Sequence, residues 1–256
     1  MKISVITAVF NDEGHIEGCI RSVLGQGYNN LEYIVVDGGS NDKTPEIVSR
    51  YSGRVVKISS SGPSGLYTSL NRGISAAAGQ VIGFLHSDDL YAAGDVLESV
   101  ARIFSDKGAD CVYGDLEYVD RRDTSKVIRY WRAGECRPEK LRRGWFPPHP
   151  ALFIKKDIYD KYGLFDASFR IAADYDLMLR FLLDKGIKAC YLPKVLIKMR
   201  AGGMSNRSLR CLLKKSYEDF VILKKHKIRF PLLVLLNKNI SKIPQFFNLK
   251  KKQGVL

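Results

Sequence analysis

Short apolar runs alternate with amphipathic stretches along the first two-thirds of the chain. Apolar residues on consecutive positions predict strands that are covered on both faces, at residues 3–10, 33–36, 55–58, 81–85 and 111–113. Apolar residues at helical spacing predict helices between them, at residues 13–25, 44–51, 65–78 and 94–105. This alternation predicts an α/β fold with a single domain, in which helices cover both faces of a mostly parallel central sheet.

The rest of the chain follows a looser pattern. Residues 120–150 are rich in Arg, Gly and Pro and are expected to form connecting loops. A strand at 151–154, a helix at about 174–184 and a strand at 188–192 follow. From about residue 205 the pattern is helical and basic, which predicts a basic amphipathic helical extension over 205–256.

Charge is distributed unevenly along the 256 residues. The formal net charge is +14, but residues 1–186 hold 24 Lys and Arg against 25 Asp and Glu, whereas residues 187–256 hold 17 against 2. A basic end of this kind suits nucleic acid, an anionic membrane surface or an acidic partner, and net charge alone does not choose between them. No apolar run approaches the roughly 20 residues that span a bilayer, and the first residues lack the pattern of a signal peptide. The five cysteines are scattered without a Cys-x-x-Cys pair, which favours reduced thiols in the cytoplasm.

Polar residues follow the predicted strands where ligands bind in open α/β sheets, beyond the carboxyl ends. Adjacent Asp88 and Asp89 end the fourth run, where two desolvated carboxylates require a cation or hydrogen-bond donors. Carboxylate and phosphate oxygens are the ligands of Mg²⁺ or Mn²⁺. The alternative is a turn that caps the helix near residue 94. Asp37 begins an Asp-Gly-Gly-Ser segment after the second run, and this segment taken alone is more typical of a simple turn than of a ligand site.

Two common nucleotide-binding motifs are missing from the sequence. No Gly-x-Gly-x-x-Gly follows the first strand, and no Gly-x-x-x-x-Gly-Lys-Ser/Thr occurs. Their absence argues against a dinucleotide-dependent dehydrogenase and a P-loop NTPase.

Taken in order, the motifs resemble the family-2 glycosyltransferases, which have the glycosyltransferase A-type fold. The resemblance covers nearly the whole chain, and its departures lie at residues 61–68, where relatives often have acidic residues and a Lys, and at Ala173, where many have Glu. The matching segments are residues 7–11, 37–44, 65–74, 84–89, 173–177 and 202–205.

The resemblance implies a binding site for a nucleotide-sugar donor, a UDP-sugar being favoured. Asp37 would accept a hydrogen bond from the base, and the Arg72 guanidinium would contact the diphosphate. Asp89 would hold Mn²⁺ or Mg²⁺, with Asp88 on the ribose or the metal. The other donor contacts that the family implies are Thr7, Ala8, Phe10 and Asn71.

The resemblance also implies an inverting reaction. Asp174 matches the general base, which would take the proton of an acceptor hydroxyl as that oxygen attacks the anomeric carbon. His149 would face the acceptor, or else lie satisfied in a proline loop. Gly202 and Gly203 would belong to a lid, or else to a simple turn. Asp176 is expected to pair with a basic neighbour such as Arg180, four positions later.

These implications divide the chain into a glycosyltransferase domain over 1–204 and the basic extension over 205–256. The donor half would span about 1–115 and the acceptor half about 116–204. The expected acceptor is a glycan or lipid-linked hydroxyl in surface polysaccharide biosynthesis. The extension would then hold a cytoplasmic enzyme peripherally on the inner face of the plasma membrane, or else pack on the domain.

Two other functions remain open from the sequence. A nucleic-acid-binding protein acting through the basic end would carry aromatic residues among the basic ones, but the apolar residues there are mainly aliphatic, and no nucleic acid partner is expected. A nucleotidyltransferase would share the metal carboxylates, but the chain lacks a Gly-rich triphosphate loop with Lys or Arg after the first strand.

Overall fold

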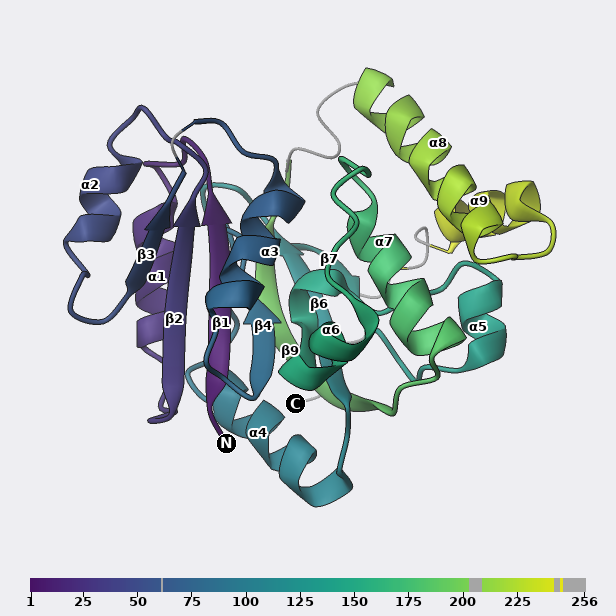
Figure 1. Ribbon diagram of the computed structural model, residues 1–256, viewed down its shortest axis with the longest axis horizontal. Helices are drawn as coiled ribbons and strands as arrows, with labels where there is room; N and C mark the ends of the chain where they lie inside the picture. The colour runs from purple at the N-terminus through teal and green to yellow at the C-terminus, as the bar shows by residue number, and fades with distance from the viewer. Residues whose placement is uncertain (61, 203–208, 242–244, 246–256) are drawn as a thin grey trace.

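The computed structural model describes residues 1–60, 62–202, 209–241 and 245. Its centre is a nine-stranded sheet in the order β3-β2-β1-β4-β8-β6-β9-β5, with β7 paired to β6 (Figure 1). The strands are β1 Ile3–Val9, β2 Leu31–Asp37, β3 Val56–Ser59, β4 Val81–Phe84, β5 Leu90–Tyr91, β6 Cys111–Val119, β7 Val127–Trp131, β8 Leu152–Lys155 and β9 Ala189–Arg200.

The helices follow the predicted amphipathic stretches through the first 110 residues. They are α1 Ile16–Leu24, α2 Thr44–Ser49, α3 Leu66–Ala76, α4 Val96–Lys107, α5 Pro138–Arg142, α6 Lys156–Tyr162, α7 Ala173–Met178, α8 Leu209–Lys225 and α9 Pro231–Ile240. A 3₁₀ turn covers His149–Ala151, and α7 continues into a π-helical stretch over Leu179–Asp184.

The first half of the sheet is parallel, as its continuous apolar runs predict. Strand β1 is buried along its whole length and pairs in parallel with β2 and β4, and β2 pairs in parallel with β3. Strand order reverses at β1, because β2 and β3 lie on one side of it and β4 on the other. The carboxyl ends of β1, β2 and β4 therefore lie at the edge where open α/β sheets bind ligands, and this edge is the candidate ligand-binding crevice.

The second half of the sheet is mixed and more structured than expected. Strand β8 is antiparallel to both β4 and β6, whereas β9 runs parallel to β6. The prediction that residues 120–150 are only loops is wrong, because they contain β7 and α5. Strand β7 forms by antiparallel pairing with the distal half of β6, a tertiary contact that a five-residue pattern does not reveal.

Helices cover both faces of the sheet, as predicted (Figure 1). One core layer places α1 and α4 against the sheet, with Ile20 and Val100 fully buried. The other layer joins α3, α6, α7 and α8 to the opposite face, with Leu70 and Tyr159 buried.

The basic extension packs on the domain over its described residues. Ile222 and Leu223 of α8 and Val234 of α9 lie in the same core layer as α7. Lys238 of α9 is buried and pairs with Asp219 of α8 at 2.9 Å, and burial lowers the pKa of this lysine. Within the described part of the chain, none of the helices has the length and apolar character needed to cross a bilayer.

Candidate active site

Two loops at the carboxyl ends of β1 and β2 are tied together by polar contacts. The Asn11 N–H donates to Ser40 Oγ at 2.9 Å, and Asn11 Oδ1 accepts the N–H of Asn41 at 2.9 Å. The next residue, Asp12, donates its N–H to Oγ1 of Thr44, the first residue of α2, at 3.0 Å. Asn11 adopts a left-handed φ of 50°, which Asn tolerates better than most residues. The two loops thus form one wall of the crevice beside β1.

The predicted base-binding residues occupy this wall in different ways. Asp37 is buried at the end of β2, where Oδ1 accepts the Ser40 N–H at 2.9 Å. Phe10 is half exposed at the end of β1, and Ala8 is nearly buried. Thr7 is fully buried with its hydroxyl 3.1 Å from that of Tyr33, so it supports the crevice from within the core.

Asp88 and Asp89 lie together at the end of β4. The side chain of Asp89 is 1% exposed; Oδ1 accepts the Arg200 N–H at 3.1 Å, and Oδ2 has no hydrogen-bond partner among the described residues. Burial raises the pKa of Asp89 well above its usual range, and the charge of Asp88 raises it further. The more exposed Asp88 lies 3.7 Å from the Arg121 guanidinium.

The Asp88–Asp89 pair suits a divalent cation because Asp89 Oδ2 is buried and finds no hydrogen-bond donor among the described residues. A buried carboxylate oxygen without a donor is costly, and a cation would remove that cost and keep Asp89 ionised. The described residues contain no cluster of three or more His, Cys, Asp or Glu side chains suited to a metal. The remaining ligands would therefore come from phosphate oxygens or water, as Mg²⁺ prefers.

Asp174 lies in the first turn of α7. The Tyr67 hydroxyl of α3 lies 3.2 Å from Asp174 Oδ1 and 2.7 Å from the carbonyl oxygen of Ile171. Burial raises the pKa of Tyr67, and the charge of Asp174 adds to the effect, so the phenol stays protonated and donates.

Two histidines near these acids contact one another: His86 is partly buried and His149 is buried. The rings of His86 and His149 are 6.0 Å apart, and His149 stacks on Phe84 at 5.6 Å. Burial lowers the pKa of His149 to about 4, and it also lowers that of His86 against the opposing charges of Asp88 and Asp174. Both rings are therefore neutral near pH 7. His149 is not a surface residue in a loop, because it is 6% exposed and neither ring nitrogen has a partner in the described chain.

A sequence model of the family described as Glycosyl transferase family 2 matches residues 4–168. The chain belongs to glycosyl transferase family 2. It is 28% identical over 208 residues to a PGL/p-HBAD biosynthesis glycosyltransferase of Mycobacterium tuberculosis, with 79% of this chain and 78% of the relative covered. It is 31% identical over 186 residues to an uncharacterized glycosyltransferase of the same species, covering 71% of this chain and 69% of the relative.

Solved structures show that this glycosyltransferase has the A-type fold. A structure of S. aureus TarS 1–349 superposes with a TM-score of 0.68 at 17% identity, covering 99% of this chain and 74% of TarS 1–349. The chain spans 39% of a longer TarS structure. The mannosyltransferase PcManGT from Pyrobaculum calidifontis, solved with GDP-Man and Mn²⁺, superposes with a TM-score of 0.67 at 18% identity, covering 100% of this chain and 76% of that one.

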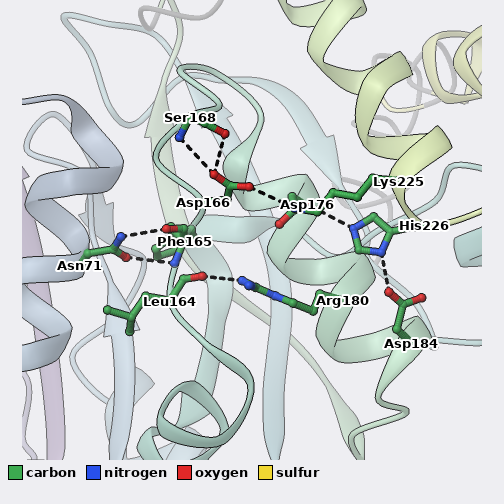
Figure 2. Close-up of polar contacts among 10 residues, drawn as sticks. All are labelled: Asn71, Leu164, Phe165, Asp166, Ser168, Asp176, Arg180, Asp184, Lys225 and His226. Atoms are coloured by element: carbon green, nitrogen blue, oxygen red, sulfur yellow. Dashed lines mark hydrogen bonds and ion pairs between the residues drawn. The ribbon is translucent and has the colours of Figure 1, made fainter.

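Two predicted donor contacts of the glycosyltransferase have internal partners. The Asn71 amide donates to the Phe165 carbonyl at 2.8 Å and accepts the Phe165 N–H at 3.0 Å, so it anchors the loop before α7 (Figure 2). The Arg72 guanidinium contacts the Ser60 hydroxyl and lies at the end of β3. Both residues line a hollow of about 570 Å³ that Asp88, Asp89 and Asp174 do not line. Their role as donor contacts stays a prediction.

The structure adds contacts that the sequence did not predict. Arg121 reaches Asp88 from the segment expected to be loop, and the Arg200 guanidinium donates to the Asp88 carbonyl. Tyr67 of α3 reaches Asp174 of α7 within one core layer. Only the Arg type itself, near a predicted lid, could have drawn attention to Arg200. Gly202 follows with a φ of +92°, in a turn after β9, and Gly203 lies outside the described residues.

The expected pair of Asp176 with Arg180 is wrong. Asp176 Oδ1 pairs with Lys225 at 2.8 Å and with His226 at 3.0 Å, whereas Arg180 donates to the Leu164 carbonyl (Figure 2). Residues 179–184 are π-helical, and the cations of α8 face Asp176, so spacing along the helix does not decide its partner.

Proposed function

We propose that this glycosyltransferase moves a sugar, with inversion, from a UDP-sugar to a hydroxyl of a glycan or lipid-linked acceptor. The observation that carries the proposal is the presence of two separate acidic positions. In the Asp88–Asp89 pair the buried Asp89 Oδ2 has no hydrogen-bond partner among the described residues, and Asp174 lies 3.2 Å from the Tyr67 hydroxyl. One group of acids suits a nucleoside diphosphate with its cation, and the other suits an attacking hydroxyl. Family membership favours this reaction over nucleic-acid binding or nucleotidyl transfer.

The chemistry assigns one role to Asp174 and another to the Asp88–Asp89 pair. Asp174 accepts the proton of the acceptor hydroxyl while that oxygen forms a bond to the anomeric carbon, and the bond from this carbon to the diphosphate oxygen breaks. Asp89 and Asp88 would hold Mn²⁺ or Mg²⁺, which when bound offsets the charge of the departing nucleoside diphosphate. Arg121 and Arg200 supply fixed positive charge at the same place.

The comparison proteins support the proposed class of donor, and a hydrolysis assay with a panel of nucleotide sugars would test it. S. aureus TarS has been solved with UDP and with UDP-GlcNAc, and PcManGT with GDP-Man. Full-length protein with Mn²⁺ or Mg²⁺ should release nucleoside diphosphate slowly from one member of a panel of UDP-glucose, UDP-galactose, UDP-N-acetylglucosamine and GDP-mannose. Folded protein that neither binds nor hydrolyses any of them, with either metal, would contradict the proposal.

We also propose that α8 and α9 dock the enzyme on an anionic membrane. Leu213, Leu232 and Leu233 are exposed by 72%, 70% and 63% of their surface, an unusual number of large apolar side chains for two short helices. Lys224 and Lys227 are also exposed, and helices that lie in a charged interface combine exposed apolar and basic side chains. The other exposed large apolar residues of α8, α9 and the segment between them are Leu212, Tyr217, Phe230, Leu236 and Ile240.

Vesicle sedimentation tests the membrane proposal. The full chain should bind vesicles that contain phosphatidylglycerol, more weakly as salt rises, and should not bind pure phosphatidylcholine. The double variant Leu232→Ser/Leu233→Ser should lose binding, whereas Ile128→Ser, which removes an exposed apolar residue of β7, should not. Absence of binding would contradict the membrane proposal, and a dimer that the double variant dissociates would show that a second copy of the chain covers these residues.

A further inference from the structure

The loop before α7 is held by Glu218, an acid of the C-terminal extension. Glu218, in the middle of α8, is 6% exposed. Its Oε1 accepts the Arg170 N–H at 3.1 Å, and its Oε2 accepts the N–H groups of Ile171 at 2.8 Å and Ala172 at 3.0 Å. One buried carboxylate therefore binds three consecutive backbone amides, and hydrogen bonds to a charged acceptor are the strong ones.

The sequence of this loop makes it depend on Glu218. Helix α7 has no side-chain cap, since Ala172 and its neighbours carry no Ser, Thr, Asp or Asn at the capping position. The Ala172 carbonyl accepts the N–H groups of Tyr175 and Asp176, which form the first turn of α7. Glu218 thus fixes the residue from which the helix starts, two positions before Asp174.

Both backbone polar groups of Ile171 are hydrogen-bonded to side chains. Glu218 accepts its N–H, while the Tyr67 hydroxyl donates to its carbonyl and lies within hydrogen-bonding distance of Asp174. The backbone that Glu218 orders therefore also fixes Tyr67 relative to the Asp174 carboxylate.

Helix α8 is itself fastened to the same region. Lys225 pairs with Asp166 at 3.0 Å and with Asp176 at 2.8 Å, and His226, directly after α8, contacts Asp176 (Figure 2). Because these contacts join α8 to both the loop and α7, the carboxylate of Glu218 is presented by a rigid support.

We propose that Glu218 is a positioning residue for the general base, so that the basic extension belongs to the catalytic machinery. This rests on the proposed role of Asp174. A displacement of about 1 Å at a reacting group costs roughly 100-fold in rate, so loss of the three hydrogen bonds should lower kcat and leave donor binding intact.

The experiment compares Glu218→Gln and Glu218→Ala with Asp184→Asn in the full chain. The control removes an acid that contacts α8 through His226 and does not touch residues 170–172. The donor is the panel member that the wild-type chain hydrolyses fastest, at a temperature well below the lowest Tm of the set. We expect kcat to fall roughly 10-fold in Glu218→Gln, which keeps one acceptor oxygen, and roughly 100-fold in Glu218→Ala, with KM and the Kd for UDP within about twofold of wild type.

A second measurement, amide hydrogen exchange at residues 170–172, does not depend on activity. Exchange should accelerate in Glu218→Ala and not in Asp184→Asn. Unchanged exchange, an unchanged kcat in Glu218→Ala, or an equal loss of kcat in Asp184→Asn would overturn the positioning role. A wild-type chain without turnover on any donor would instead refute the proposed function, and exchange alone would then decide whether Glu218 orders the backbone before Asp174.

Discussion

The Tyr67 hydroxyl lies 3.2 Å from Oδ1 of Asp174, although the two residues are 107 positions apart in the chain. Tyr67 belongs to α3, in the half of the chain that the sequence predicts to bind the donor, and Asp174 lies in the first turn of α7, in the half that it predicts to bind the acceptor. The contact therefore joins the two halves of the expected active site through one hydrogen bond to a carboxylate.

Tyr67→Phe should lower kcat by roughly 10-fold, because it removes the hydroxyl that donates a hydrogen bond to the Asp174 carboxylate and orients it. The substitution leaves the aromatic ring unchanged. KM for the donor should not change, since the hydroxyl lies next to the proposed base. Steady-state kinetics with the hydrolysed donor measure both values. A rise in KM with constant kcat would place Tyr67 in donor binding instead.

Asp174→Asn should reduce transfer by about 10²–10⁴-fold while UDP still binds, because a general base is lost and the Asp88–Asp89 pair is untouched. Calorimetric titration with UDP and Mn²⁺ measures binding, and product analysis measures transfer. Loss of UDP binding in this variant would contradict the assigned division of roles.

Asp89→Asn is expected to have the opposite effect on binding. The buried Oδ2 of Asp89, which has no partner in the described part of the chain, is best placed to require a cation, so UDP binding should lose its dependence on Mn²⁺. Titrations with and without EDTA check this result. Equal affinities of the variant and the wild type in Mn²⁺ would show that Asp89 does not hold the cation.

Asn71→Ala tests whether Asn71 anchors a loop or contacts the donor. It removes two hydrogen bonds to the Phe165 backbone and leaves both peptide groups unpaired, which should cost about 1–3 kcal/mol of the free energy of unfolding. Urea unfolding measures the cost. If stability is unchanged and KM for the donor rises, Asn71 is a donor contact, as the family resemblance implies.

The pH dependence of stability should carry the signature of His226. Burial lowers the pKa of His226, but hydrogen bonds and charge from Asp176 and Asp184 outweigh it, so the pKa is raised above the ordinary 6.5. A raised folded-state pKa stabilises the protein fully below about pH 6.5, and this contribution is lost as pH rises through the folded-state value. The Tm should therefore fall from pH 6 towards alkaline pH, and the fall should be smaller in His226→Asn. Parallel curves for the two proteins would contradict the shift.

The sequence by itself determined the parallel half of the sheet and the acids at its edge. Strands that are buried on both faces must be apolar at consecutive positions, so β1 and β4 are visible as runs, and polar residues after them mark the crevice. Local pattern therefore located Asp37, Asp88 and Asp89, and the family resemblance located Asp174.

Only the tertiary structure decided which side chains meet. Asn71 binds the Phe165 backbone and Asp176 pairs with α8, because burial requires each polar group to find whichever partner lies nearest in space. The same reason explains the basic extension. Its charge suggested a separate segment, yet Glu218 of α8 binds the loop before Asp174 across 46 to 48 positions of sequence, a distance over which no local pattern specifies a contact.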